Sequence, residues 1–456
     1  METFDAIIIG TGQAAPPLAG RLSGAGLRVA VIERGAVGGT CVNAGCTPTK
    51  AMVASARAAQ AIRAAGALGV QAGPPVIDMA AISDRAARIA ADSRRSVEGW
   101  LAGMQGVELI RGHARFAGPR QVQAGDRALM ADRIFLNVGA RPAVPDLPGL
   151  AEVDYLTSTT ILGLRRVPAH LAIVGGSYIG LEFAQMFRRF GAEVTVVERG
   201  ARLIPREDPE ISDAIREILE SEGIAIRTGA DCIRLSRGAE GPQVHVSCTE
   251  GDPVIAASDL LLAVGRTPNT GDLGLAAAGL APDARGNIPV NDRLETAVPG
   301  IWALGDCNGR GGFTHTAWND YEIVAANLLD GADRRVTDRV PGYALYIDPP
   351  LGRAGMTEAA ARAAGHRILT ASRPMSRVGR AVEKGETHGL MKAVVEEGSG
   401  RILGAAILGT GGDEAIHGVL DMMTAGAGAE VLQRAVPVHP TVSELIPTLM
   451  GELRPA

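Results

Sequence analysis

The chain has 456 residues, of which 46% are hydrophobic, 21% charged and only 3% aromatic, and its formal net charge at pH 7 is −5. This length suits about three domains, and the scarcity of aromatic side chains and of basic blocks argues against a nucleic-acid partner. Because no charged leader and no run of about 18 apolar residues are found, we expect a cytoplasmic protein without a membrane partner.

The first 33 residues predict a dinucleotide-binding unit. An apolar strand at 5–9 is followed by Gly10, Gly12 and Ala15, by a helix to residue 25, and by a strand at 28–32 that ends at Glu33. The glycines let the backbone approach a pyrophosphate at the N-terminus of the helix. A carboxylate at the end of the second strand accepts hydrogen bonds from a ribose.

Two cysteines, Cys41 and Cys46, follow this unit within a glycine-rich segment. A disulfide that closes so short a loop stabilises a fold little, so redox exchange is the better reason for the pair. Thr47 and Pro48 predict the start of a helix that continues through an alanine-rich run at 51–65. Cys46 then lies at a helix N-terminus, where unpaired N–H groups and the macrodipole favour its thiolate.

A second unit with the same spacing begins at a strand over 171–174. Gly175, Ser177 and Gly180 precede a helix to residue 190 and a strand at 193–197 that ends at Glu198. Gly10 and Glu33 lie 23 positions apart, as do Gly175 and Glu198. Two fingerprints with identical spacing predict that the chain binds two dinucleotides.

The rest of the chain predicts domain crossings and a different C-terminal fold. Residues 136–142 and 262–268 are similar, with Gly139 and Gly265 in turns that we interpret as crossings between domains. An apolar strand from Ile301 ends near Asp306, where an open α/β sheet places ligand contacts. From about 336 an α+β pattern follows. The strands predicted in this C-terminal domain are 343–347, 390–395 and 402–408, and its predicted helices are 358–364 and 414–425. Two hairpin tips are predicted in the chain, at 238–241 and at 396–400.

With these features and the motif His439-Pro-Thr-X-X-Glu444, the chain resembles the FAD-dependent pyridine nucleotide-disulfide oxidoreductases over essentially its whole length. The resemblance implies an α/β fold with two Rossmann-like domains, one for FAD (1–149 and 270–335) and one for NAD(P) (150–269). An α+β dimer-interface domain (336–456) would follow. Residues 313–321 and 348–358 are most similar to the mercuric-reductase-like branch, which includes bacterial copper(II) reductases of reactive-chlorine defence.

The resemblance also implies roles for individual residues. Cys46 would be the thiolate that faces the flavin and Cys41 the thiol that meets the acceptor. His439, oriented by Glu444, would be the acid–base group and would come from the other subunit of a homodimer. Lys50 and Glu182 match an ion pair beneath the flavin. The FAD site would comprise Gly10, Gly12, Ala15, Glu33, Gly39, Thr40, Lys50, Gly139 and Asp306; the NADH or NADPH site would comprise Gly175, Gly180, Glu198, Gly265 and Tyr178, the last as an aromatic gate over the nicotinamide.

The acceptor is the least determined part of the prediction. No cysteine follows Cys307, so we expect neither a mercury relay nor a C-terminal redox tail. A small thiophilic acceptor, Hg(II), Cu(II) or a compact disulfide, is favoured. Three alternatives stay open: a dihydrolipoamide dehydrogenase or glutathione-reductase-type enzyme, an NAD(P)H:quinone or oxygen oxidoreductase with an idle disulfide, and a non-catalytic subunit.

Two further expectations concern the coenzyme and the remaining cysteines. Glu198 favours NADH because its carboxylate would repel a 2′-phosphate, although Arg199 and Arg202 oppose this preference. No resident metal site is expected. Cys232, Cys248 and Cys307 are predicted to be packing residues.

Overall fold

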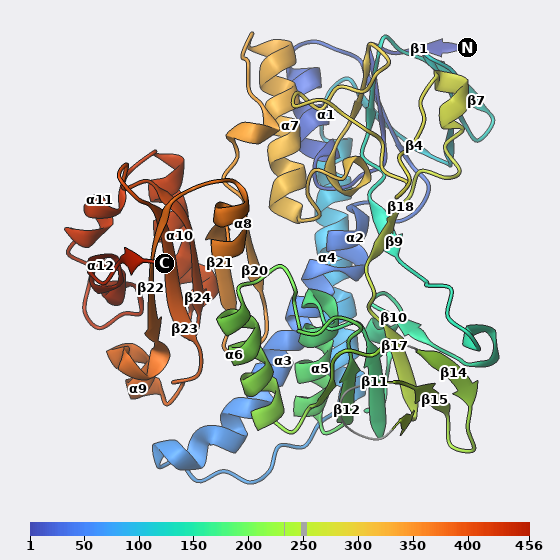
Figure 1. Ribbon diagram of the computed structural model, residues 1–456. Coiled ribbons are helices and arrows are strands. Elements are labelled where there is room, and N and C mark those ends of the chain that lie inside the picture. Colours follow the sequence, from blue (N-terminus) through green and yellow to red (C-terminus); the bar gives the residue numbers. More distant parts are fainter. Residues whose placement is uncertain (232, 248–252) are drawn as a thin grey trace. The chain divides into compact units, whose positions relative to one another are not determined.

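The computed structural model describes residues 1–231, 233–247 and 253–456, and the chain falls into two compact units (Figure 1). The first unit consists of Met1–Ala51, Ser83–Ala143 and Gly265–Arg339. The second consists of Met52–Ile82, Val144–Val264 and Val340–Ala456. Each unit contains one of the two glycine fingerprints.

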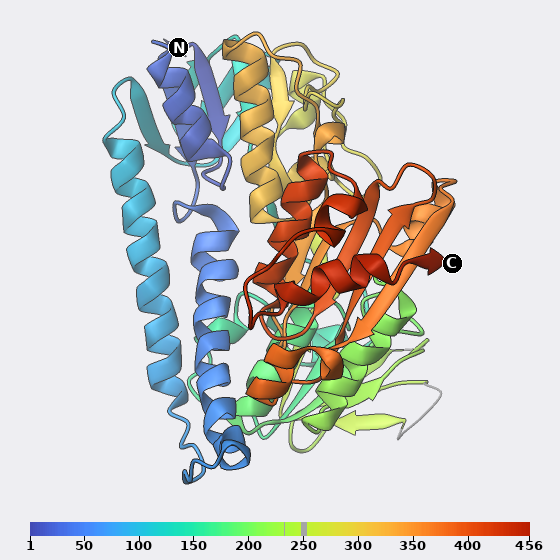
Figure 2. The same cartoon turned by 90° about the vertical axis from the view of Figure 1, so that its left-hand side faces the viewer.

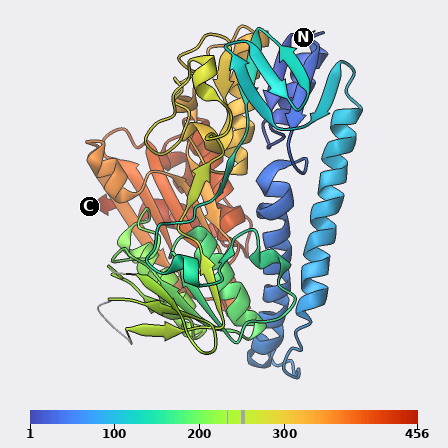
Figure 3. The ribbon, with the colours of Figure 1, turned by 90° about the vertical axis from the view of Figure 1, so that its right-hand side faces the viewer.

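The first unit is built on a parallel sheet with the strand order β19-β8-β2-β3-β4. The central strands β2 (Ala6–Ile9) and β3 (Val29–Glu33) are almost wholly apolar, as expected of strands covered on both faces. Because alternate residues point to opposite faces, Ile8 packs with α1 (Ala15–Gly24) and α7 (Thr314–Leu329) (Figure 2). Ile7 points to the other face, toward the antiparallel strands β5, β6 and β7 (cyan in Figure 3).

The remaining strands of the first unit are β1 (Glu2–Thr3), β4 (Val107–Arg111), β5 (Ala114–Gly118), β6 (Gln121–Ala124), β7 (Arg127–Met130), β8 (Arg133–Leu136), β9 (Ala140–Pro142), β18 (Arg266–Pro268) and β19 (Ile301–Ala303). The segments predicted to cross between domains pair with each other, since β9 and β18 form an antiparallel two-stranded sheet. Helix α2 (Gly39–Ala44) lies within this unit. Helices α3 (Cys46–Ala64) and α4 (Met79–Ala102) belong partly to each unit.

The second unit repeats the same layers around a parallel sheet with the order β10-β17-β11-β12-β13. Helix α5 (Tyr178–Phe190) contacts β11 and β12, and α6 (Pro209–Ser221) contacts β13. Strands β14, β15 and β16 pack on Ala172 and Val174 of β11. The strands of this part are β10 (Leu156–Thr157), β11 (His170–Val174), β12 (Glu193–Val197), β13 (Ala225–Arg227), β14 (Arg234–Arg237), β15 (Pro242–His245), β16 (Val254–Ala256) and β17 (Asp259–Leu262).

The C-terminal part of the second unit is an antiparallel sheet with the order β20-β21-β24-β23-β22-β25, in orange and red in Figure 1. Helix α10 (Gly412–Thr424) packs on β21 and β24. This part is the predicted α+β domain. The predicted hairpin tip at 396–400 joins the paired strands β23 and β24, and the tip at 238–241 joins β14 and β15 elsewhere in the second unit. Its other elements are β20 (Gly342–Leu345), β21 (Leu351–Gly355), β22 (Ile368–Pro374), β23 (Leu390–Glu396), β24 (Ile402–Leu408), β25 (Arg454–Pro455), α8 (Glu358–Ala363), α9 (Gly379–Lys384), α11 (Ala429–Gln433) and α12 (Ile446–Gly451).

The predicted α/β fold class is therefore confirmed. Helix α4 was not predicted. Within the described residues, no helix is both long and apolar enough to cross a membrane.

Candidate active site

The two cysteines of the predicted redox pair lie on consecutive helices of the first unit. Cys41 is in the first turn of α2, and Cys46 is the first residue of α3. Gly45 joins the helices closely, because a Cβ placed on it would lie 2.8 Å from the carbonyl oxygen of Thr40. The helix begins slightly earlier than Thr47 and Pro48 predicted, and Pro48 is tolerated because the amides of a first turn have no helical partner.

The surroundings of the two sulfurs distinguish them. Cys41 is half-buried and Cys46 is exposed. The hydrogen bond to Cys46 and burial raise the pKa of Cys41 far above its ordinary value. The Sγ atom of Cys46 lies 3.4 Å from Oγ1 of Thr314, the first residue of α7. Cys46 is thus the more exposed sulfur and lies in the N-terminal turn of its own helix, whereas burial and the hydrogen bond to Cys46 favour the protonated form of Cys41.

The first fingerprint has the close backbone packing that a dinucleotide needs. Gly10 has a φ of +93°, and a Cβ on it would lie 2.4 Å from the carbonyl oxygen of Asn137. A Cβ on Gly39 would lie 2.9 Å from the Cα of Gly12. Ala15 begins α1, where its N–H donates to the carbonyl oxygen of Gly12 at 3.0 Å and Pro16 and Pro17 have no N–H, so a pyrophosphate would bind to the glycine turn and the positive end of the helix. The residues present therefore fit the adenine dinucleotide part of FAD.

Glu33 closes the turn of this fingerprint. Its Oε2 accepts a hydrogen bond from the N–H of Thr11 at 3.0 Å, and its Oε1 accepts one from the N–H of Gly35 at 2.7 Å. The second fingerprint repeats this arrangement. Glu198 accepts from the N–H of Gly176 at 2.7 Å and from that of Gly200 at 2.6 Å. The repeat predicted from spacing thus extends to equivalent hydrogen bonds.

The second fingerprint is equally tight. Gly175 has a φ of +116°, and a Cβ on it would lie 2.4 Å from the carbonyl oxygen of Ala263. A Cβ on Gly180 would lie 2.0 Å from the carbonyl oxygen of Gly175. Ser177, which replaces the middle glycine, has an extended backbone and precedes α5. A side chain is tolerated there because φ is negative.

Asp306 is linked to a residue that the sequence did not single out. Asp306 lies in a short 3-10 helix after β19, and its Oδ2 accepts from Nε of Arg266 at 3.3 Å. Arg266 also donates to Oγ1 of Thr40 at 3.4 Å and to the carbonyl oxygen of Ala140. Gly139, with a φ of +64°, precedes β9. The repeated segment around Gly265 contained the signal for Arg266, but its contacts appear only in the folded unit.

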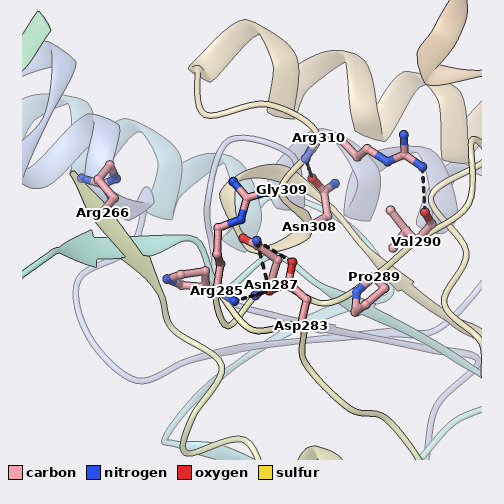
Figure 4. A pocket seen from close by; sticks show the side chains of 10 residues that line it. Arg266, Asp283, Arg285, Asn287, Pro289, Val290, Asn308, Gly309 and Arg310 are labelled. Carbon is pink, nitrogen blue, oxygen red and sulfur yellow. Dashed lines mark hydrogen bonds between the residues drawn. The ribbon is translucent and has the colours of Figure 1, made fainter. Parts of the chain in front are cut away.

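Arg266 also lines a cavity of about 430 Å³ in the first unit (Figure 4). Asn287 is held there by Asp283, and Arg310 donates to the carbonyl oxygen of Val290. The cavity is lined by Arg266, Pro268, Asp283, Arg285, Asn287, Pro289, Val290, Asn308, Gly309 and Arg310, which include none of the predicted site residues.

Tyr178 and Glu182 lie one helical turn apart at the start of α5. The buried Glu182 accepts from the N–H of Tyr346 at 3.0 Å. Tyr178 packs edge-on against Tyr343, with ring centroids 5.4 Å apart, and burial raises the pKa of Tyr178 to about 12. Lys50 belongs to the first unit and Glu182 to the second, so their ion pair stays a prediction.

The C-terminal motif forms the predicted side-chain pair. Nδ1 of His439 lies 2.9 Å from Oε2 of Glu444, and the imidazole is 80% exposed while Glu444 is 17% exposed. The neighbouring Val436 and Val438 are also strongly exposed. Glu444 can thus orient an imidazole whose other nitrogen faces away from its own chain.

Neither the remaining described cysteine nor a group of possible metal ligands contributes to the candidate active site within the described residues. Cys307 is fully buried in the core, as predicted, and burial raises its pKa to about 12. Cys232 and Cys248 lie outside the described residues. In the described part of the chain, no group of three or more His, Cys, Asp or Glu side chains could hold a metal ion.

Comparison with known proteins identifies consistent relatives. The family described as pyridine nucleotide-disulphide oxidoreductase matches residues 4–320, and its dimerisation domain matches residues 341–450. The chain is 36% identical to a probable pyridine nucleotide-disulfide oxidoreductase, RclA, of Escherichia coli, over 99% of each chain. It is 36% identical to a mercuric reductase of Streptomyces lividans, over 97% of this chain and 94% of the relative. A solved Cu(II) complex of the HOCl-induced flavoprotein disulfide reductase RclA from Escherichia coli superposes with a TM-score of 0.89 at 35% identity, over 99% of each chain.

Proposed function

The chain belongs to the pyridine nucleotide-disulphide oxidoreductase family, and from that premise we propose that Cys41 and Cys46 pass electrons to a small thiophilic acceptor. The observation that carries this proposal is the asymmetry of the pair: Cys41 is half-buried on α2, whereas Cys46 is exposed and is the first residue of α3. A mercuric reductase and an RclA solved with Cu(II) are among the relatives. Soft thiolates suit Hg(II) and Cu(I).

FAD, when bound, would take a hydride from the nicotinamide and supply two electrons to the disulfide. Gly10, Gly12 and Ala15 would hold its pyrophosphate at the start of α1, and Glu33 would bind its ribose. Asp306 would hold the ribityl chain, with Gly39, Thr40, Lys50 and Gly139 as further contacts. The NAD(P)H site would be formed by Gly175, Gly180, Glu198, Gly265 and Tyr178.

The thiols would then deliver the electrons outward. Two electrons and one proton convert the disulfide into the thiolate of Cys46 and the thiol of Cys41. His439, oriented by Glu444, would remove the proton from Cys41 when the acceptor binds. The two electrons suffice for one disulfide, for one Hg(II), or for two Cu(II) reduced to Cu(I), and the Cys41–Cys46 disulfide re-forms.

The working unit would be a homodimer in which His439 serves the partner's disulfide. The matched dimerisation domain supports this arrangement, as do the exposure of His439 and the exposed apolar residues Val436 and Val438. We place the reaction in the cytoplasm, because a cysteine pair that must cycle through its reduced form suits a reducing compartment.

We propose NADH as the coenzyme. Glu198 is fixed by the N–H groups of Gly176 and Gly200, so its carboxylate cannot easily turn away from a 2′-phosphate. Arg202 lies 3.4 Å from Asp213, which reduces its availability to a phosphate. Comparison of kcat/KM for NADH and NADPH tests the proposal, and a clear preference for NADPH would refute it.

An acceptor screen tests the main proposal. NADH oxidation is measured with Cu(II), Hg(II), oxidised glutathione, lipoamide and a quinone, for wild type, Cys41→Ser and the control Cys307→Ala, which alters a buried cysteine outside the pair. We expect a metal ion or a small disulfide to be the best acceptor, with activity lost in Cys41→Ser and retained in Cys307→Ala. A quinone that is the best acceptor and is reduced equally well by Cys41→Ser would contradict the proposal.

A further inference from the structure

We propose that Tyr343, Glu207 and Arg353 form a buried anchor that holds Tyr178 closed over the nicotinamide position, so that coenzyme entry requires Tyr178 to be released. The three residues are positioning residues, because they act through Tyr178. The inference rests on the proposed function, in which Tyr178 lies at the nicotinamide.

The anchor begins with the contact between two tyrosines. Tyr178 is the first residue of α5, directly after the glycine fingerprint, and Tyr343 lies on β20. Their rings meet edge-to-face at 79°, a favourable geometry for aromatic pairs. Tyr178 is therefore held at its ring.

Glu207 and Arg353 fix the orientation of Tyr343. The Tyr343 hydroxyl donates to Oε1 of Glu207, and Glu207 is paired with Nε of Arg353 at 3.1 Å and with its Nη2. The side chains of Glu207 and Arg353 are 0% and 1% exposed. Burial and the carboxylate of Glu207 raise the pKa of Tyr343 far above its ordinary value. Tyr343 thus remains a donor to Glu207.

The anchor is continuous with the fingerprint turn. The segment after Glu198 folds back so that the N–H of Ile204 donates to the carbonyl oxygen of Gly176 at 3.0 Å. The N–H of Glu207 donates to the carbonyl oxygen of Ile204, also at 3.0 Å. Ile204 has a φ of +43°, which is unfavourable for a β-branched residue and persists only where its surroundings enforce it. Glu207 is therefore fixed relative to the coenzyme site.

Stability alone does not explain the anchor well. Within the described residues, the buried Nη1 of Arg353 has no hydrogen-bond partner. Buried ion pairs seldom stabilise a fold more than apolar side chains would, and an unsatisfied N–H is unfavourable. A role in holding Tyr343 and Tyr178 gives a reason for a charged pair at this position.

The consequence is a lowered affinity for the nicotinamide half of the coenzyme. When only the open fraction of a protein can bind, the apparent Kd rises by the inverse of that fraction. ADP-ribose contains the adenosine and both phosphates but no nicotinamide, so its binding does not require Tyr178 to move. Loss of one hydrogen bond that closes the gate should therefore tighten nicotinamide binding roughly three- to tenfold and leave ADP-ribose binding unchanged.

Calorimetric titration of the oxidised holoenzyme with NAD⁺ and with ADP-ribose tests the inference. Tyr343→Phe keeps the ring and removes the hydroxyl that donates to Glu207, and Tyr343→Ala also removes the ring that contacts Tyr178. Tyr321→Phe is the matched control, because Tyr321 packs on Trp318 in the first unit. Both Tyr343 variants should bind NAD⁺ three- to tenfold more tightly, and Tyr343→Ala should bind it at least as tightly as Tyr343→Phe. The control should match wild type.

Other outcomes overturn the inference in distinguishable ways. Unchanged NAD⁺ binding in Tyr343→Phe means that Tyr343 does not hold the gate, and weaker binding means that it holds the open form. Parallel changes in NAD⁺ and ADP-ribose binding would show a general disturbance of the domain. If wild type binds NADP⁺ in preference, the comparison is made with NADP⁺ and 2′-phospho-ADP-ribose. A wild type that binds none of these ligands refutes the proposed function itself.

Discussion

Replacement of Thr314 by valine tests the arrangement around the Cys46 sulfur. The substitution removes the hydroxyl that lies 3.4 Å from Sγ and leaves a side chain of similar shape. The start of α7 should persist, because Thr316 bonds the backbone of Phe313 there. Hydrogen bonds to charged groups contribute about 1.5–3 kcal/mol. We take the lower end because Cys46 is exposed, which corresponds to roughly a tenfold loss of thiolate.

The rate of alkylation by iodoacetamide measures this loss. The reduced, flavin-depleted protein is treated at pH 7, and peptide mass spectrometry follows Cys46 and Cys41 separately. Cys46 should react about tenfold more slowly in Thr314→Val, in line with the thiolate population. Cys41 should react slowly in both proteins and faster as the pH rises, because its raised pKa keeps it protonated.

A control variant tests whether the slower alkylation of Cys46 is specific to the loss of the Thr314 hydroxyl. Thr424→Val removes a hydroxyl that donates to the carbonyl oxygen of Leu420 in its own helix, and it should leave both alkylation rates unchanged. A change of less than twofold at Cys46 in Thr314→Val would refute the reasoning. Faster alkylation of Cys41 than of Cys46 in wild type would contradict the raised pKa of Cys41.

Three further predictions concern the thiols, the anchor and the dimer. In the two-electron-reduced holoenzyme, Cys46→Ser should abolish the long-wavelength thiolate-to-flavin absorption band and Cys41→Ser should retain a thiolate beside the flavin; the opposite pattern would reverse their roles. Glu207→Gln should lower the free energy of unfolding by about 3 kcal/mol, because Arg353 stays buried with less counter-charge, and a urea titration that gives less than 1 kcal/mol would contradict this. Inactive Cys41→Ser and His439→Ala subunits should regain part of the activity when mixed, since one site of a mixed dimer is intact; no recovery despite subunit exchange, measured by native mass spectrometry, would mean that His439 does not serve its partner.

Local sequence patterns predicted strands well where apolar residues run between clear breaks. The strand expected at 193–197 is β12 (Glu193–Val197), and the strand at 402–408 is β24 (Ile402–Leu408). Both are short β-branched or aliphatic runs that end at a charged residue or a glycine. Helix α4 was missed because its buried positions are few and partly small, as Ala86 and Ala90 illustrate, so its apolar stripe is weak.

The site shows a similar division between local and distant information. Glycine fingerprints and the cysteine motif are local, so Gly10, Gly175 and the redox pair could be singled out from sequence. Tyr343 and Glu207 are 136 positions apart, and Glu207 and Arg353 are 146 apart. No residue near these side chains along the chain indicates that they pair. A buried ion pair becomes visible only when the fold brings its members together and removes water.

The carboxylate of Glu198 has a consequence for how coenzyme preference can diverge. It accepts from two backbone N–H groups, those of Gly176 and Gly200, and a carboxylate has enough lone pairs to bind a ribose as well. Replacing Glu198 to admit a 2′-phosphate would also remove the two backbone hydrogen bonds that fix the turn at the pyrophosphate position. Substitutions at Arg199 or Asp213 change the charge nearby without touching these amides. Variants whose coenzyme preference shifts from NADH to NADPH would therefore first change at such flanking positions. Glu198 would be the last residue to be replaced.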